Sequence, residues 1–584
     1  MSTVLFLLSS ELSLLLTERL NPINMIGVLA DSSQRKFVEE FFELFKTPWE
    51  PFQEKKSYHV VVTTRDSLPP VAGCLTFICT AARGGFDTGK SRKFSKPGHP
   101  IWIEYGRHHL PIYGDLRTFQ QAQGPLAHVS ATHEPVCYVL HSAHSKIIRI
   151  GYDIFYEIEY LLTQGQPPGS AHVPTLDLHI AMLRNCILDS GIPLIEIPPC
   201  PYGHNYTVCL THDVDFLAIR DHLFDHSLAG FLSRIFSPLF QRNMKQQIPW
   251  SRLFKNIKAA FSLPLVYAGL TKDIWFDLDR YTEIEEGIRS TFFFIPFRDQ
   301  PGSCKSGPAP KYRAARYDVA RNKKHIEKLL EKGHEIGLHG IDAWLNIEKA
   351  IAERETIKTL TSGECLGVRM HWLYFDINSA RILEKAGFHY DSTRGYNETV
   401  GYLTGTAQVF LLPGTSNTYE LPLHVMDTSL FSGKRGRLHE SSAFERCNNL
   451  CNYCEKYGGV LTINWHTRSL NPERNWDDFY LYLLEYLRSR NVWFAGARQA
   501  VEWFKLRRSV QFESVEWSTN NVKLALNTRR PEAGEDLLNL PKLRVRAYKP
   551  TRSASTVAGA PSRYAYAEMP WHGEPQLEIM TTDH

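Results

Sequence analysis

The stretch Tyr206-Thr-Val-Cys-Leu-Thr-His-Asp-Val-Asp215 is the most informative part of this chain. Its apolar first half, Tyr206–Leu210, predicts a short buried strand. Two carboxylates follow the strand, and residues i and i+2 of an extended chain point to the same side. Asp213 and Asp215 can therefore address one point, one holding a metal ion while the other takes a proton from water. An Asp-rich turn after a strand is the alternative.

Length and composition describe a globular chain of several domains. It has 584 residues, of which 43% are hydrophobic and 22% charged, so about three or four domains are expected. The net charge of +4 gives no indication of nucleic-acid binding. Eleven cysteines without a paired secretory framework favour a reducing, cytoplasmic location. The apolar start, residues 1–16, has neither the basic region of a leader nor the length of a membrane span, so no transmembrane segment is expected, although export stays open.

Three regions follow one another along the chain. Residues 1–200 predict an N-terminal α/β domain, in which strand-like runs alternate with helical patterns. Residues 206–504 repeat β/α units around a helical insertion at about 220–285, a pattern typical of a barrel or barrel-like sheet. Residues 506–584 predict a small β-rich C-terminal appendage that ends in a loose Ser/Ala/Gly/Pro tail, Ser553–Ser562.

Two motifs of cofactor-binding proteins are not interpreted as sites. Gly84–Ser91 fits the phosphate-binding loop pattern, but the prolines in the following Arg92–Pro100 leave no room for the helix that a phosphate site needs. Cys447, Cys451 and Cys454 have the spacing of an iron–sulfur motif, yet they share the apolar face of one predicted helix. We therefore expect no nucleotide or cluster here.

Four later segments end in polar residues at the close of predicted strands. They are Gly333–His339, Gly367–Trp372 with Arg369, Tyr390–Thr393 with Asp391, and Leu461–His466. Barrels of β/α units collect their catalytic groups at the carboxyl ends of their strands. These residues are therefore expected to lie near Asp213 and Asp215.

In that order the residues resemble the polysaccharide deacetylases of carbohydrate esterase family 4, the NodB-homology superfamily. The resemblance covers about residues 206–504. The whole chain resembles a bacterial branch of the family that has an additional N-terminal α/β domain. It implies a distorted (β/α) barrel of NodB type and a divalent metal, commonly zinc. It also implies an acetylated carbohydrate as the substrate, from which acetyl groups on nitrogen are removed.

The resemblance also implies a role for each matching residue. Asp213 resembles the catalytic base, Asp215 and His339 resemble metal ligands, Arg369 resembles the residue that orients the base, His466 resembles the general acid, and Asp391 matches the fourth motif loosely. Such residue types suit amide hydrolysis, because a metal polarises the carbonyl and a histidine can protonate the leaving amine.

The second motif departs from the family pattern. Where the family has another histidine, four residues after His339, this chain has Ala343. Asp342 is the expected third ligand, because catalytic zinc sites accept mixed histidine and carboxylate sets. Otherwise the site has two protein ligands or recruits another residue.

The expected function is that of a metal-dependent hydrolase that de-N-acetylates a carbohydrate. The alternative is a degenerate deacetylase fold that binds glycans or acts as a scaffold, which Ala343 would favour. Hydrolysis of a non-sugar amide is a third possibility. Trp344, Trp372 and Trp465 are candidates for sugar-stacking surfaces or for core residues. The sequence leaves the oligomeric state open.

Overall fold

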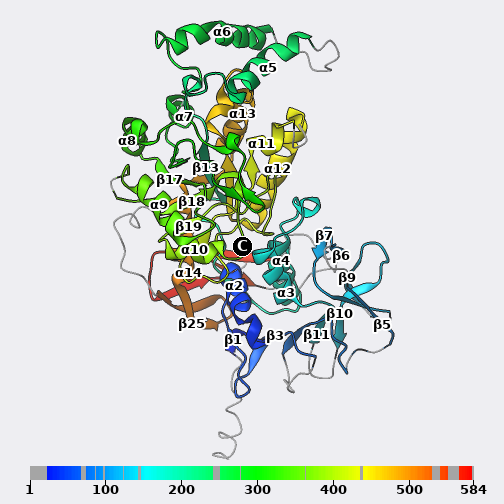
Figure 1. The fold of residues 1–584 in the computed structure, drawn as a ribbon. Helices are drawn as coiled ribbons and strands as arrows, with labels where there is room; N and C mark the ends of the chain where they lie inside the picture. Colours follow the sequence, from blue (N-terminus) through cyan, green and yellow to red (C-terminus); the bar gives the residue numbers. More distant parts are fainter. Residues whose placement is uncertain are drawn as a thin grey trace, which may run out of the picture.

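The computed structural model describes residues 23–581 except for 67–73, 86, 88, 96–98, 121, 123, 142–145, 241–249, 277, 362, 434–437, 529–539 and 550–563. The apolar start and the Ser553–Ser562 tail lie outside the described residues. The chain is a mixed α/β structure with two large sheets and smaller ones beside them (Figure 1). Among the described helices, none combines the length and the apolar character that crossing a bilayer requires.

A nine-stranded sheet of order β2-β1-β3-β4-β11-β10-β9-β6-β7 forms the N-terminal part. Its strands are β1 (Ile23–Leu29), β2 (Trp49–Pro51), β3 (Tyr58–Thr63), β4 (Leu75–Cys79), β6 (Ile101–Tyr105), β7 (His108–Ile112), β9 (Pro125–Val129), β10 (Pro135–His141) and β11 (Lys146–Ile150), with β5 (Ser91–Phe94) and β8 (Leu116–Phe119) paired separately. The half from β2 to β11 is parallel, and the half from β11 to β7 is antiparallel.

Three helices cover apolar surface of this sheet: α2 (Arg35–Phe45), α3 (Ile154–Thr163) and α4 (Thr175–Asp189). Helix α3 begins after Asp153, whose carboxylate accepts hydrogen bonds from the backbone N–H groups of Phe155 and Tyr156. The core under these helices also takes in Phe410 and Leu412 from the second half of the chain. The N-terminal part is therefore joined to the rest by shared apolar packing.

The two motifs set aside on sequence grounds are structural. Strand β5 begins at Ser91, where a phosphate-binding loop needs the first turn of a helix. Cys447, Cys451 and Cys454 are buried on α12 (Glu440–Tyr457), within the main hydrophobic core. The predicted position of the three cysteines on the apolar face of a helix is confirmed, and the helix that a phosphate site needs does not begin at Ser91.

The central sheet has the order β20-β21-β19-β18-β17-β14-β13-β23-β22, with β24 also paired to β13. Its strands are β13 (Tyr206–Val214), β14 (Thr291–Phe294), β17 (Glu335–Gly340), β18 (Gly367–Met370), β19 (Tyr390–Asp391), β20 (Phe410–Leu411), β21 (Tyr419–Glu420), β22 (Val425–Met426), β23 (Val460–Asn464) and β24 (Val492–Phe494). All neighbours are parallel except β20 and β21. Among the described strands the two ends of this order do not pair, so the expected barrel is a curled half-barrel sheet.

Strand β13 is longer than the sequence predicted. The apolar pattern ended it at Leu210, but Thr211 to Val214 continue in parallel register with Thr291–Phe294 of β14. These polar residues stay in the strand because the Thr211, His212 and Asp213 side chains find buried polar partners.

Helices cover the half-barrel, and one helical pair stands out from it. The covering helices are α7 (Leu278–Ile284), α8 (Lys323–Glu331), α9 (Ile347–Lys358), α10 (Ser379–Lys385), α11 (Asp427–Phe431), α12, α13 (Asp477–Arg488) and α14 (Ala497–Ser509), and a short hairpin of β15 (Ser303–Cys304) and β16 (Gly307–Pro308) lies between β14 and α8. The predicted insertion contains α5 (His226–Phe240) and α6 (Trp250–Tyr267), which lie at one end of the molecule, at the top of Figure 1.

The C-terminal residues form two three-stranded sheets. One contains β25 (Val510–Trp517), β26 (Asn521–Thr528) and β29 (Gln576–Met580), and the other contains β12 (Leu194–Glu196), β27 (Leu543–Lys549) and β28 (Ala565–Trp571). Strand β12 precedes the central sheet in the chain yet pairs with β27 near its end. The C-terminal strands therefore also bind the linker between the first two regions.

Arg507 on α14 connects three parts of the fold. Its fully buried guanidinium donates to the backbone oxygens of Ile197 (2.9 Å), Glu43 (3.0 Å) and Leu44 (2.9 Å). The acceptors belong to the linker and to the end of α2. One cation therefore satisfies several carbonyl oxygens inside the fold.

We expect Arg507→Met to destabilise the protein by on the order of 3 kcal/mol or more, because each buried acceptor left without a donor costs about 1–3 kcal/mol. Urea denaturation followed by circular dichroism measures the change. Arg498→Met on the same helix is the control. Arg498 is partly exposed and paired with Glu364, so its loss should cost less than about 1 kcal/mol. Equal shifts in both variants would contradict the proposed bridging role.

Candidate metal-binding and catalytic site

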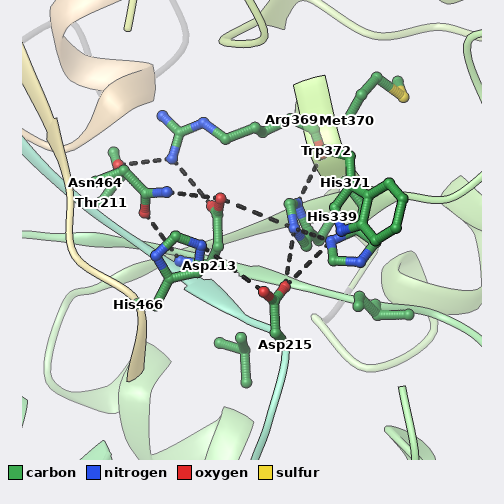
Figure 2. A network of polar contacts seen from close by, with 12 residues as sticks. Thr211, Asp213, Asp215, His339, Arg369, Met370, His371, Trp372, Asn464 and His466 are labelled. Carbon is green, nitrogen blue, oxygen red and sulfur yellow. Dashed lines mark hydrogen bonds and ion pairs between the residues drawn. The ribbon is translucent and has the colours of Figure 1, made fainter. Parts of the chain in front are cut away.

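The polar side chains predicted from the sequence gather at the carboxyl ends of neighbouring central strands. Asp213 closes the polar end of β13 and Asp215 follows it, so the two carboxylates face the same side, as the spacing predicted (Figure 2). His339 comes from β17, Arg369 from β18, and His466 follows β23. Parallel strands place these ends together at one edge of the sheet.

Asp215, His339 and His371 form the one group among the described residues with the geometry to hold a metal ion. The Asp215 Oδ1 atom lies 3.2 Å from His339 Nε2 and 3.2 Å from His371 Nδ1. The two ring nitrogens are 3.0 Å apart. Such separations are those expected between donors that share one small cation at about 2.1 Å.

The tautomers of the two histidines support this interpretation. His339 Nδ1 lies 2.9 Å from the backbone oxygen of Arg369, and His371 Nε2 lies 3.2 Å from that of Arg313. A carbonyl oxygen only accepts hydrogen bonds, so each of these nitrogens carries the proton. In the neutral rings, His339 Nε2 and His371 Nδ1 then face each other with lone pairs. A cation or an added proton between them removes that repulsion.

The carboxylate of Asp215 is prepared for a positive charge. Its Oδ1 is buried and has no hydrogen bond of good geometry, although two ring nitrogens are near. Burial opposes ionisation, but His371, His339 and His466 outweigh it and hold the pKa of Asp215 well below its ordinary value. An ionised oxygen whose lone pairs accept no hydrogen bond can coordinate a metal ion. The donor set therefore fits a divalent cation.

Asp213 is held in one orientation by two donors. Arg369 Nη1 donates to Oδ1 at 3.0 Å, and Asn464 Nδ2 donates to Oδ2 at 2.7 Å. The Asp213 backbone N–H donates in return to Asn464 Oδ1 at 3.1 Å. Burial works against the charged form, but His339, Arg369 and His466 outweigh it and lower the pKa of Asp213. The carboxylate is therefore ionised and oriented.

Arg369 is itself fully buried and is positioned by three strands. It donates to Thr211 Oγ1 of β13 at 2.7 Å and to the backbone oxygen and hydroxyl of Ser392, just past β19. Its guanidinium also lies 4.6 Å from the ring centroid of Phe293 on β14. The charge that orients Asp213 is thus held by hydrogen bonds and an aromatic face.

His466 lies across Asp215 from His339 and His371 (Figure 2), and it is paired with Asp427. Asp427 accepts from the backbone N–H of His466 at 2.7 Å and lies 2.6 Å from its Nδ1. The free Nε2 points toward Asp215 Oδ2, 3.7 Å away. Burial disfavours the imidazolium, but Asp427, Asp215 and Asp213 outweigh it and raise the pKa of His466 to about 9.

Two residues predicted for the site lie outside this group. The carboxylate of Asp342, the expected third ligand, accepts hydrogen bonds from the backbone of Ser303 at 2.7 Å and from Lys349 Nζ at 2.6 Å. It is neutralised there by the lysine, and the group that can hold a metal contains His371 instead.

Asp391 is fully buried beside Glu420, its register partner on β21, and accepts a hydrogen bond from Thr393. Burial raises the pKa of Asp391 to about 6, and the hydrogen bonds from Thr393 and Glu420 oppose that rise. Two adjacent buried carboxyl groups favour sharing a proton over carrying two charges. The contacts described for Asp391 therefore belong to a neighbouring pair and not to the Asp213 group.

Sequence reasoning missed three members of the site: His371, Asp427 and Asn464. A signal existed for two of them, since His371 lies two residues after Arg369 and Asn464 two before His466, which is the spacing of one strand face. Asp427 follows β22, which has only two residues and no readable alternation. Its role was not accessible from the sequence.

The three tryptophans have different surroundings. Trp344 and Trp465 are buried in the core. Trp372 is partly exposed next to His371, and its ring lies 5.7 Å from that of Tyr312. Only Trp372, among these three, offers an accessible aromatic surface beside the metal-binding group.

Comparison with known proteins gives a partial match. No protein-family model and no curated protein matches this chain. Solved structures similar to it include a protein assigned as a polysaccharide deacetylase from Mycobacterium smegmatis (18% identity, 53% of this chain and 95% of that chain, TM-score 0.32). Others are a protein assigned the same activity from Pseudomonas aeruginosa PAO1 (16%, 53% and 94%, TM-score 0.35) and Puue allantoinase (16%, 52% and 92%, TM-score 0.33). Each of these similarities covers about half of this chain.

Proposed function

We propose that this protein is a metal-dependent hydrolase that removes acetyl groups from an N-acetylated carbohydrate. The observation that carries the proposal is the set of three donor atoms, Asp215 Oδ1, His339 Nε2 and His371 Nδ1, separated by only 3.0–3.2 Å. Their lone pairs converge on one point next to an ionised, oriented Asp213. This combination suits hydrolysis better than structural packing, which has no use for converging lone pairs.

Asp215, His339 and His371 would hold the ion, with His371 in the place first expected for Asp342. Two histidines and one carboxylate form a donor set typical of catalytic zinc. A divalent cation bound there would polarise the amide carbonyl as a Lewis acid and make water more acidic. The backbone oxygens of Arg369 and Arg313 keep both imidazole rings in the ligand orientation.

Asp213 is the proposed general base. Its carboxylate accepts the proton of the attacking water. Arg369 and Asn464 hold the carboxylate in one orientation during the transfer, so that a remaining lone pair can accept this proton. The arginine also keeps Asp213 ionised before the reaction, because a permanent positive charge opposes premature protonation.

His466 is the proposed general acid. Asp427 binds Nδ1 of His466 and stabilises the imidazolium. The proton on Nε2 is then the one that faces the two aspartates and can be donated. Breakdown of a tetrahedral adduct requires protonation of the departing nitrogen, since an amide anion is a poor leaving group.

Aromatic side chains next to the ligands support a sugar substrate. Trp372 lies beside His371, and Tyr312, which is largely exposed, lies beside Trp372. Flat rings with a polar rim suit the apolar face of a pyranose. Arg313 lies 5.7 Å from the centroid of Trp372 and orients that ring.

The ligand assignment predicts different effects for His371 and Asp342. We expect His371→Ala to lower the affinity for zinc by at least tenfold, since loss of even a supporting residue costs about 10–100-fold. Elemental analysis and zinc titration of the purified protein measure this. Asp342→Asn is the control and should bind zinc as the unchanged protein does. Loss of zinc in the Asp342 variant alone would favour the original expectation.

The acid and base roles predict loss of turnover without loss of metal. Asp213→Asn and His466→Ala should each reduce kcat on acetylated chitooligosaccharides by about 10²–10⁴-fold, because each removes one proton transfer. Release of acetate is the measurement, and zinc content and melting temperature serve as controls. A chain that binds the oligosaccharide but releases no acetate in any form would instead support the degenerate, glycan-binding alternative.

The pairing of His466 with Asp427 predicts a change in the pH profile. A general acid must be protonated, so activity falls as the pH rises through the pKa of His466, which Asp427 helps to raise to about 9. Asp427→Asn removes that charge, and the alkaline limb of kcat/KM should move to lower pH by about one unit or more. The Asp342→Asn variant should keep the original limb. An unchanged limb in Asp427→Asn would remove His466 from the acid role.

A further inference from the structure

The helical insertion after β13 carries an unusual charge. Between Asp225 and Asp273 the sequence contains no aspartate or glutamate but seven lysines and arginines. The whole chain has a net charge of only +4, so the remainder is net negative. Arg234 pairs with Glu473, and Arg252 pairs with Glu440 and Asp478, so part of this charge is compensated by other elements. The remaining positive charge on the described part of α6 lies on Lys255 and Lys258, and it indicates attraction to an anionic surface.

Helix α6 has a second, outward-facing apolar surface. Trp250, Phe254, Phe261 and Leu265 are 85%, 72%, 75% and 51% exposed. Their spacing of four, seven and four residues places them in one stripe along the helix. The stripe runs along most of an 18-residue helix, about 27 Å long.

The opposite face of α6 is already used for packing. Ala259, Leu263 and Val266 are buried against Phe231 and Ile235 of α5. The exposed stripe is therefore separate from the face of α6 that packs against α5. It is apolar surface in addition to what the fold needs, and large exposed aromatic patches of this kind mark interaction sites.

Lysines border the exposed stripe. Lys258 and Lys255 are exposed on the flank of α6 next to Phe254 and Phe261. A helix with Trp, Phe and Leu on one side and lysines along that side has the composition of helices that lie in a membrane interface. The α5–α6 hairpin stands at one end of the molecule, where a flat surface can approach it (Figure 1).

We propose that the outer face of α6 attaches this protein to an anionic membrane surface. Trp250, Phe254, Phe261 and Leu265 enter the interface, and the basic side chains of the hairpin contact lipid phosphates and carboxylates. Self-association through the same face is disfavoured, because it would bring together two hairpins that contain only positive charges. The proposal is independent of the proposed catalytic function.

Sedimentation of the full-length chain with lipid vesicles tests the proposal. We expect binding to vesicles of phosphatidylcholine mixed with phosphatidylglycerol, weaker binding to phosphatidylcholine alone, and release by salt. Phe254→Ser combined with Phe261→Ser should weaken binding at least tenfold. Lys255→Glu combined with Lys258→Glu should weaken it by at least about fivefold for each lysine removed.

Ile377→Ser is the matched control, since Ile377 is 83% exposed but lies outside the hairpin, and it should leave binding unchanged. Binding that survives both double substitutions would overturn the proposal. So would failure to bind vesicles together with a dimer that the Phe254 and Phe261 substitutions dissociate, because the stripe would then serve a second copy of the chain. Acetate release in solution should be the same in all variants, which separates this result from any failure of the catalytic proposal.

Discussion

The buried ion pair between Arg369 and Asp213 is the interaction on which the candidate site depends. Both groups are buried, and burying a charge is costly unless the charge is paired and hydrogen-bonded. Arg369 reaches Thr211 on β13, Ser392 just past β19 and the face of Phe293 on β14, so neighbouring parts of the sheet together bury one charge. Removing either partner would leave an uncompensated charge inside the sheet.

The same residue links this ion pair to the metal-binding group. The Arg369 side chain orients Asp213, while its backbone oxygen accepts the proton of His339 and so sets that ring's ligand nitrogen. The position of the four-residue strand β18 therefore determines both the base and a metal ligand. His371, the proposed third ligand, comes two residues after Arg369. A shift of β18 would therefore move the base and the metal-binding group together.

Much of this arrangement was predictable from the sequence, and the failures have local causes. Five side chains were predicted to lie together because each comes at the end of a strand with a clear apolar pattern. The structure brings these five together: Asp213, Asp215, His339, Arg369 and His466. His371 was missed although its spacing from Arg369 offered a signal, because β18 ends at Met370 and the strand pattern stops before this residue. Asp342 was expected from its proximity to His339, but Lys349 neutralises it. The sheet stays open where a barrel was expected, because its outermost strands have only two residues.

The helical insertion, which contains no aspartate or glutamate between Asp225 and Asp273, gives the molecule an uneven distribution of charge. Positive charge is concentrated at the α5–α6 end, and the rest of the chain is net negative. Such a separation contributes to a molecular dipole, and a charged surface exerts a torque on a dipole beyond the range of direct contact at low ionic strength. The protein would therefore rotate before it arrives, so that orientation is chosen during the approach and each encounter begins with the same end forward.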